Sequence, residues 1–263
     1  MNMHTPPVGE RLREWRQRRR LSQLAFACDA EISARHLSFL ETGRSRPSRD
    51  MLLHLAELLD VPFRERNELL LAAGFAPVYS EKSLDSPDAA AARRAVDLVL
   101  KGSEPYPALA VDRHWNLVAA NSAAGLFLRD VDPALLAEPI NVLRLSLDPR
   151  GLAPRIENLA AWRSHIFMRL ERQVAQTADA DLAVLLEELK AMPGGTNEDG
   201  ADDYGGLIAP VKIRTEGGTL TFFTATTVFG TAVDISFSEL VIESFFPGDA
   251  FTAAAMRAAM GDA

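Results

Sequence analysis

The sequence predicts an all-helical amino-terminal domain followed by an α+β domain with an antiparallel sheet. Three observations lead to this prediction. The length of 263 residues suits two domains of ordinary size. Five short segments with helical periodicity follow one another in the first part of the chain. After them, strand patterns occur on both sides of long helical segments, which is typical of a sheet covered by helices.

Each helix expected in the first domain has a recognisable beginning or end. A serine side chain is a good N-cap, glycine readily ends a helix, and basic residues suit a helix carboxyl end. The expected helices are one around Leu12 and Trp15 that closes at Arg18, Arg19 and Arg20, a second capped by Ser22, a third from Ser33 to about Thr42 stopped by Gly43, a fourth at residues 50–59 capped by Ser48 or Arg49, and a fifth at residues 63–73 ended by Gly74.

The second part of the chain mixes strands and helices. The expected elements, in order, are a linker at 77–85, a helix from Ser86 to about Leu100 with Gly102 as its stop, strands at 108–111 and 115–119, a short helix beginning at Asn121 and Ser122, helices at 156–177 and 181–190, a mobile glycine-rich loop at 192–206, strands at 208–215 and 218–228 joined by a hairpin turn, a strand or short helix at 235–243, and a terminal helix at 249–260. We therefore place a first domain at residues 1–76, a linker with a connecting helix at 77–104, and a second domain at 105–263.

Composition favours a soluble globular protein. The apolar fraction is 48% and the charged fraction 24%. The sequence has neither an apolar run long enough for a membrane span nor the features of a signal peptide, so we expect a cytoplasmic protein without membrane insertion. The single cysteine, Cys28, allows no internal disulfide, and no set of ligands for a metal or motif for a cofactor is recognisable.

Charge is distributed unevenly along the chain. The net charge is −8, but residues 1–49 contain ten arginines and five acidic residues, so this segment carries about +5 and the remainder about −13. A basic amino-terminal segment followed by an acidic remainder indicates that only the amino-terminal segment contacts the phosphates of a nucleic acid.

The third expected helix has two different faces. Its 100° advance per residue places Leu37 and Leu40 on the packing side and leaves the opposite side free to read bases. On that side Arg35 has the fork geometry for guanine edges, and Ala34 and Phe39 can touch thymine methyl groups. The phosphate contacts expected around it position the module without reading sequence. The expected contacts to duplex DNA are Gln23, Ser33, Ala34, Arg35, Ser38, Phe39, Thr42, Arg44 and Arg46.

This segment of about 65 residues resembles the helix-turn-helix modules of the XRE and lambda-repressor group. The resemblance implies an internal ion pair between Arg16 and Glu41 that joins the first and third helices. Arg20 and Glu31 stand where these modules usually have a glycine in a left-handed turn. A non-glycine residue there costs about 1 kcal/mol, so either the turns differ or the protein tolerates the cost.

The second domain carries no recognisable nucleophile, phosphate-binding loop or metal motif, so we do not expect an enzyme. It is instead rich in large apolar side chains, among which Arg144, Arg163 and Arg214 could anchor an acidic group at the mouth of an apolar cavity. The expected ligand-binding residues are Trp115, Asn121, Phe127, Arg144, Trp162, Arg163, Ile166, Phe167, Phe222 and Phe229.

Five segments of this domain together resemble the ligand-binding domain of MmyB-like regulators. They are Glu104-Pro-Tyr-Pro-Ala-Leu, Trp115-Asn-Leu-Val-Ala-Ala-Asn121, Asn141-Val-Leu-Arg-Leu-Ser-Leu, Thr227-Val-Phe-Gly-Thr and Glu243-Ser-Phe-Phe-Pro-Gly-Asp. The resemblance implies a PAS-like fold and a sensor of a small molecule, with a fatty acid or similar apolar carboxylate as the natural ligand. It does not say which residues line the pocket.

The leading hypothesis is a homodimeric transcription regulator in which a small apolar or fatty-acid-like ligand modulates operator binding. Two DNA-binding domains, one from each protomer, are expected because a single domain of this size contacts few bases. A second hypothesis makes the second domain only a dimerisation or partner-binding platform. A third, an enzyme fused to a DNA-targeting head, would require a pair such as His165 with Glu157 or Asp181 in a deep cleft.

Overall fold

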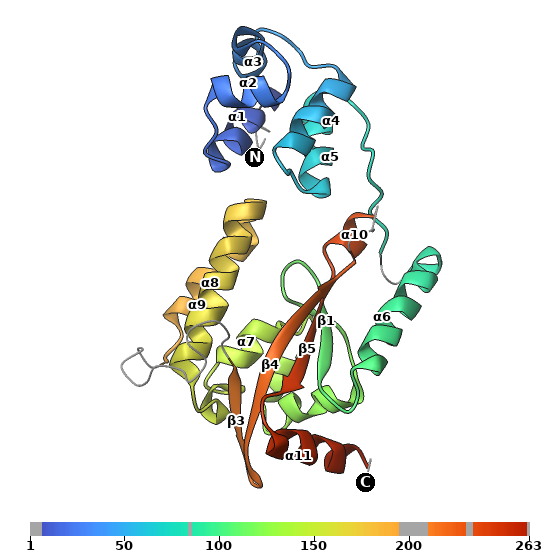
Figure 1. Ribbon diagram of the computed structural model, residues 1–263, viewed down its shortest axis with the longest axis vertical. Coiled ribbons are helices and arrows are strands. Elements are labelled where there is room, and N and C mark those ends of the chain that lie inside the picture. Colours follow the sequence, from blue (N-terminus) through green and yellow to red (C-terminus); the bar gives the residue numbers. More distant parts are fainter. Residues whose placement is uncertain (1–6, 84–85, 195–209, 230–233, 262–263) are drawn as a thin grey trace. The chain divides into compact units, whose positions relative to one another are not determined.

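The computed structural model describes residues 7–83, 86–194, 210–229 and 234–261 (Figure 1). The chain divides into two compact units, the first formed mainly by Met1–Glu81 and the second by most of the remaining residues. Each unit is described by itself. Most of the glycine-rich loop expected at 192–206 lies outside the described residues.

The first unit consists of the five predicted helices, α1 Val8–Arg18, α2 Gln23–Asp29, α3 Ala34–Glu41, α4 Arg49–Leu58 and α5 Phe63–Ala72. The serine caps form as expected: the hydroxyls of Ser22, Ser33 and Ser48 each accept a hydrogen bond from the backbone N–H three residues further on, at 3.1, 3.1 and 3.2 Å. Gly43 and Gly74 follow α3 and α5 with positive φ angles. The core of the unit is made of side chains with almost no exposure, including Leu12, Phe26, Leu37, Leu55 and Leu70.

Three turns between these helices contain a non-glycine residue in the left-handed conformation. The φ angles of Arg20, Glu31 and Asp60 are 56°, 54° and 46°. In each case the next residue donates its N–H to a carbonyl five positions earlier, as in the Schellman helix end, at 3.1, 2.9 and 2.9 Å. The turns therefore keep the shape that glycine would favour, and the protein accepts the strain.

The second unit surrounds one antiparallel sheet of five strands in the order β2-β1-β5-β4-β3, which confirms the α+β prediction. The strands are β1 Ala108–Val111, β2 Leu117–Ala120, β3 Val211–Thr215, β4 Gly218–Val228 and β5 Val241–Pro247. The α-helices are α6 Ala90–Gly102, α7 Val142–Leu147, α8 Leu159–Thr177, α9 Ala180–Ala191, α10 Ile235–Ser238 and α11 Ala250–Met260. Short 3-10 helices are η1 Pro87–Ala89, η2 Ser122–Leu128, η3 Pro133–Leu136 and η4 Ala153–Arg155.

Several boundaries differ from the sequence expectation. Gly102 is the last residue of α6 rather than its stop. The second strand begins at Leu117 because Trp115 has a φ of 66° and belongs to the turn before it. The segment at 235–243 is both a helix and a strand, since α10 is followed by the start of β5. Helix α7 was not expected, although its sequence was among the segments that carry the family resemblance.

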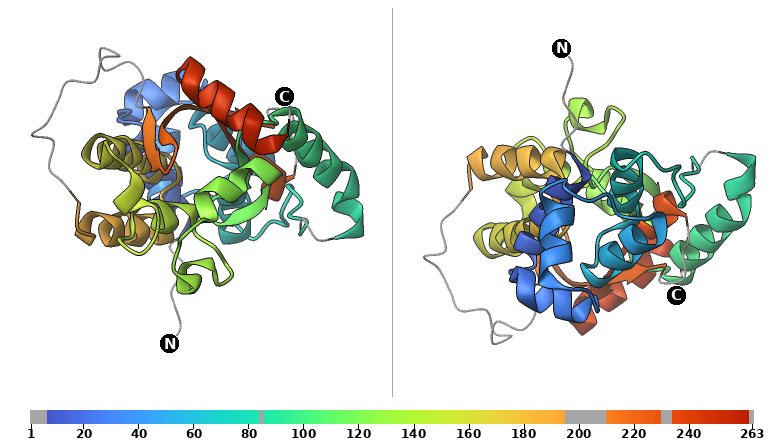
Figure 2. Two further views of the ribbon diagram at one scale, coloured as in Figure 1. Left: turned by 90° about the horizontal axis from the view of Figure 1, so that it is seen from below. Right: turned by 90° about the horizontal axis from the view of Figure 1, so that it is seen from above.

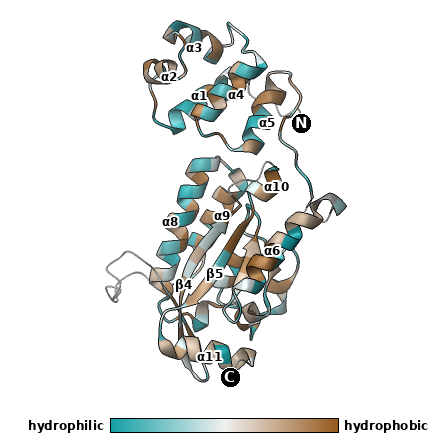
Figure 3. Cartoon of the chain, turned by 45° about the vertical axis from the view of Figure 1, so that its right-hand side comes forward, coloured by the Kyte–Doolittle hydropathy of each residue, from teal (hydrophilic) through white to brown (hydrophobic). Residues whose placement is uncertain are grey.

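Both faces of the sheet are covered. Alternate residues of β1 contribute to two cores: Ala108 and Ala110 pack in a cluster with Val96 and Leu100 of α6, whereas the side chain of Leu109 belongs to the larger core with α7, α8 and α9. Helices α8 and α9 lie side by side, with α6 across the sheet from them (Figures 1 and 2). Hydrophilic and hydrophobic stretches alternate along α8, as expected for a helix with one buried face (Figure 3).

None of the helices that the structure describes combines the length and the apolar content needed to cross a bilayer.

Candidate functional site

Helix α3 is held in place by a buried ion pair. Arg16 of α1 donates from Nε and Nη2 to the two carboxylate oxygens of Glu41, at 2.6 and 2.9 Å, and from Nη1 to the carbonyl of Leu21 at 2.7 Å. This confirms the pair that the family resemblance implied. Gln23, at the start of α2, donates its side-chain amide to the same carboxylate at 2.7 Å. The contacts tie three helices together at the carboxyl end of α3.

The opposite face of α3 presents a cationic and aromatic surface. Arg35 is exposed, and its guanidinium lies 5.3 Å from the centre of the half-buried Phe39 ring. Arg44, beyond the end of the helix, lies 5.9 Å from the same ring. Arg35, Arg44 and Arg46 form no ion pair with any residue that the structure describes, so their charges are available to phosphate or to base edges.

The other residues expected at this surface have mixed placements. Ala34 and Ser38 are half-buried, and Thr42 is exposed, with its hydroxyl donating to the carbonyl of Ser38 at 2.7 Å. Ser33 is exposed and caps α3. Gln23 is half-buried and already bonded to Glu41, so its amide supports the internal pair in this structure.

The second unit encloses an apolar cavity between the sheet and helices α7 and α8. Its empty volume is about 940 Å³, a value that includes space open to solvent. Most of the wall is aliphatic or aromatic. The lining residues are Leu109, Trp115, Leu117, Ala120, Ala124, Phe127, Leu128, Val142, Leu143, Leu145, Ser146, Leu152, Ile156, Trp162, His165, Ile166, Arg169, Val211, Ile213, Thr224, Glu243 and Phe245.

An ion pair between a half-buried guanidinium and a buried carboxylate forms the polar part of the wall. Arg169 of α8 bonds to both carboxylate oxygens of Glu243 on β5, the Nη1 contact being 3.0 Å long, and Nη2 also donates to the hydroxyl of Thr226 at 3.0 Å. The guanidinium lies 4.7 Å from the centre of the Trp115 ring. Glu243 sits on the middle strand and its side chain is only 5% exposed. The cation and the anion at this end of the cavity therefore neutralise one another.

His165 lies one helical turn before Arg169. Its ring stacks on that of Trp162, with the ring centres 5.5 Å apart. Burial, and then the positive charge of Arg169, lower the pKa of the His165 imidazole, while Glu243 opposes them. The imidazole is therefore neutral at pH 7 and can either donate or accept a hydrogen bond.

Four of the expected ligand-binding residues line this cavity: Trp115, Phe127, Trp162 and Ile166. The six others lie outside its wall. Phe222 and Phe167 pack in the core, Phe229 packs against Phe237 in the α6 cluster, and Asn121 caps η2 while donating to the carbonyls of Leu100 and Tyr106. Arg144 pairs with Glu188 at 2.7 Å, and Arg163 donates to the carbonyl of Met192 at 2.9 Å.

Sequence reasoning did not place Arg169 or Glu243 at a ligand cavity, and it considered His165 only as part of a catalytic pair. Arg214, the third arginine proposed as an anchor, pairs instead with Glu157 at 3.4 Å. A signal for Arg169 was present, because it lies seven positions after Trp162 and hence on the apolar face of α8. A basic residue within an apolar stripe requires a buried partner.

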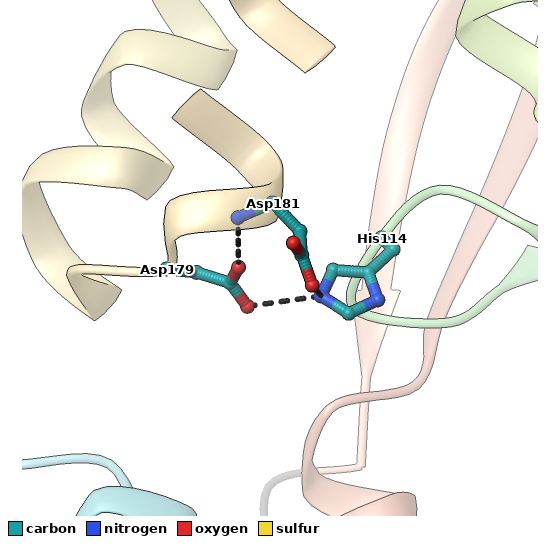
Figure 4. A group of neighbouring side chains, drawn as sticks. All are labelled: His114, Asp179 and Asp181. Carbon is teal, nitrogen blue, oxygen red and sulfur yellow. Dashed lines mark hydrogen bonds and ion pairs between the residues drawn. The ribbon is translucent and has the colours of Figure 1, made fainter. Parts of the chain in front are cut away.

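A second polar group joins the turn after β1 to the start of α9 (Figure 4). The Nε2 atom of His114 lies 3.0 Å from Asp179 and 3.9 Å from Asp181, and Arg113 lies 3.3 Å from Asp179. Burial opposes the charged form of Asp179, but hydrogen bonds from His114 and from the backbone outweigh it and lower the pKa of this carboxyl. Because Asp179 also caps α9, hydrogen bonding and ion pairing account for the cluster.

The pair of His165 with Glu157 or Asp181 is not formed, since Asp181 lies by His114 and Glu157 by Arg214.

Comparison with known proteins gives two family matches. The model described as the MmyB-like transcription regulator ligand binding domain matches residues 92–259, and a helix-turn-helix domain model matches residues 7–69. No curated protein matches the chain.

Proposed function

Because the chain belongs to the family of regulators with an MmyB-like ligand-binding domain, we propose that an apolar ligand in the α7–α8 cavity modulates operator binding by the helix-turn-helix unit. The helix-turn-helix and ligand-binding assignments support a DNA-binding regulator with a ligand-sensing domain. Both belong to regulators, which supports the expectation that the chain is not an enzyme. The observation that carries the proposal is the apolar cavity enclosed within the matched ligand-binding domain.

On the DNA side, the exposed face of α3 supports the proposed reading element. Arg35 would read a guanine edge, and Arg44 and Arg46 would meet phosphates. Ser33, Ala34, Ser38, Phe39 and Thr42 stay proposed contacts on the same face, with Gln23 beside them. We also propose that the protein acts in the cytoplasm. We further propose a homodimer, since two DNA-binding domains related by two-fold symmetry match operators with the same symmetry.

The DNA proposal is tested by fluorescence anisotropy with the duplex upstream of the protein's own gene. Wild-type affinity should fall steeply with salt concentration. Replacing Arg46 by alanine should weaken binding to all sequences about equally, whereas replacing Arg35 should also relax the preference for one base position. Absence of salt-dependent binding would contradict a DNA-binding role.

The sensor proposal is tested by native mass spectrometry of protein purified from cells, which also reports the oligomeric state. A co-purified apolar molecule, lost when Ile166 is replaced by tryptophan to fill the cavity, would support the sensor. A consistently empty domain that still forms dimers would favour the alternative, a dimerisation or partner-binding platform. The apolar wall suits the hydrocarbon chain of a fatty acid or of a similar molecule, so molecules with such a chain are the first to look for.

A further inference from the structure

The polar end of the cavity carries no net charge, and this determines which ligand groups can bind there. Arg169, the one lysine or arginine among the described lining residues, is held by Glu243 through both carboxylate oxygens and by the hydroxyl of Thr226. The two strands set this arrangement: Thr226 and Glu243 are direct partners in the β4–β5 register, and Thr224 is the partner of Phe245. The carboxylate is thus built into the sheet beside the cavity.

A charged ligand head would disturb this pair. Taking Arg169 away from Glu243 would leave the carboxylate buried without a counter-charge, which is strongly unfavourable. A ligand carboxylate that shared Arg169 would place a second anion next to Glu243, in surroundings where like charges repel more strongly than in water. A ligand ammonium group beside Glu243 would meet the same obstacle from Arg169.

Uncharged polar groups at the same end are free to bind. Neither the His165 ring nor the Thr224 hydroxyl makes a hydrogen bond to a residue within the described ranges, and both line the cavity. The neutral imidazole and the hydroxyl can each donate or accept. A ligand hydroxyl or amide could therefore bond to them without competing with the ion pair.

We infer that the cavity selects an apolar chain with an uncharged hydrogen-bonding head, such as a primary alcohol or amide, over a carboxylate or amine of the same length. This rests on the proposed function of the domain as a sensor. The Arg169–Glu243 pair is then a specificity-determining feature, and His165 and Thr224 are the groups that receive the head.

The test compares three ligands with the same chain, dodecan-1-ol, dodecanamide and dodecanoate, at pH 8 where the acid is ionised. Binding to the full-length protein is followed by tryptophan fluorescence, since Trp115 and Trp162 line the cavity, and confirmed by calorimetry. The alcohol and the amide should bind on the order of 100-fold more tightly than dodecanoate.

Three variants connect the preference to the pair. Glu243→Gln removes the anion but keeps its shape, so it should raise dodecanoate affinity at least about tenfold by freeing Arg169. The double variant Arg169→Gln with Glu243→Gln should lose that gain and keep the preference for neutral heads. Glu188→Gln is the matched control, because it removes the acid of the Arg144–Glu188 pair outside the cavity wall and should change none of the three affinities.

The outcomes separate the inference from the function on which it rests. Wild-type protein that binds dodecanoate as tightly as the alcohol overturns the inference and leaves the sensor proposal supported. Binding of none of the three ligands overturns both. If Glu243→Gln fails to fold, the affinities of the wild-type protein and of the double variant for the three ligands still test the preference for uncharged heads.

Discussion

Replacing Glu41 by alanine should destabilise the first unit far more than loss of a surface ion pair would. The change leaves the Arg16 guanidinium without its counter-charge, and the side chains of the pair are only 8% and 1% exposed. Breaking a buried pair by removing one partner costs about 3–5 kcal/mol, against about 0.2–1 kcal/mol for an exposed pair. Since a small domain is stable by about 5–15 kcal/mol, the variant should fold but open far more often.

Hydrogen exchange followed by mass spectrometry of the full-length protein measures this effect. The slowest amides of α1 and α3 should exchange at least about 150-fold faster in the variant, the equivalent of 3 kcal/mol. The matched control is Glu68→Ala, which removes an exposed carboxylate that lies 3.9 Å from the half-buried Arg11 and should accelerate exchange by no more than about fivefold. Equal effects of the two variants would refute the reasoning, as would an equal acceleration in β4 and β5 of the second unit.

Three further predictions concern single positions. Arg35→Ala should cost about 1–3 kcal/mol of discrimination at one base position, measured with a panel of single-base operator variants, and equal losses on all duplexes would contradict base reading. Gly9→Ala should destabilise the first unit by about 1–3 kcal/mol in thermal unfolding, because its Cβ would lie 2.3 Å from the carbonyl oxygen of Leu40, whereas Gly102→Ala, with open space around it, should be neutral or slightly stabilising. Asp249 has its pKa lowered chiefly by the backbone N–H three residues further on, so its stabilising effect should be present above the unfolded carboxyl pKa and lost as the pH falls through the folded one. Asp249→Asn should remove that pH dependence, and an unchanged difference between variant and wild type from pH 7 to pH 3 would disprove it.

The first unit could be predicted almost completely because its signals are local. Helix caps act over three residues, and the serines at positions 22, 33 and 48 mark helix starts within one residue of the observed ones. Even the two positions without the usual glycine were recognisable. The sequence did not reveal whether the turns at these two positions would keep the left-handed conformation, because that depends on how the helices on both sides of each turn pack.

The cavity could be predicted only in part because its specificity depends on distant residues. Trp162 and Ile166 follow from the periodicity of one helix, but Arg169 and Glu243 are 74 positions apart and meet only through the sheet. Arg144 and Arg163 were reasonable anchors by residue type. Their charges are instead engaged by Glu188 and by the carbonyls at the end of α9.

The position of β5 has a consequence for how the chain folds during synthesis. This strand lies in the middle of the sheet, where Ala108 on β1 pairs with Ser244, so the two flanking hairpins cannot join until β5 has been synthesised. At typical translation rates the ribosome needs roughly 7–30 s to add the intervening residues. The first unit has its contacts close together in sequence and can fold during that interval. A nascent chain would then acquire its proposed DNA-reading surface before it has a completed cavity.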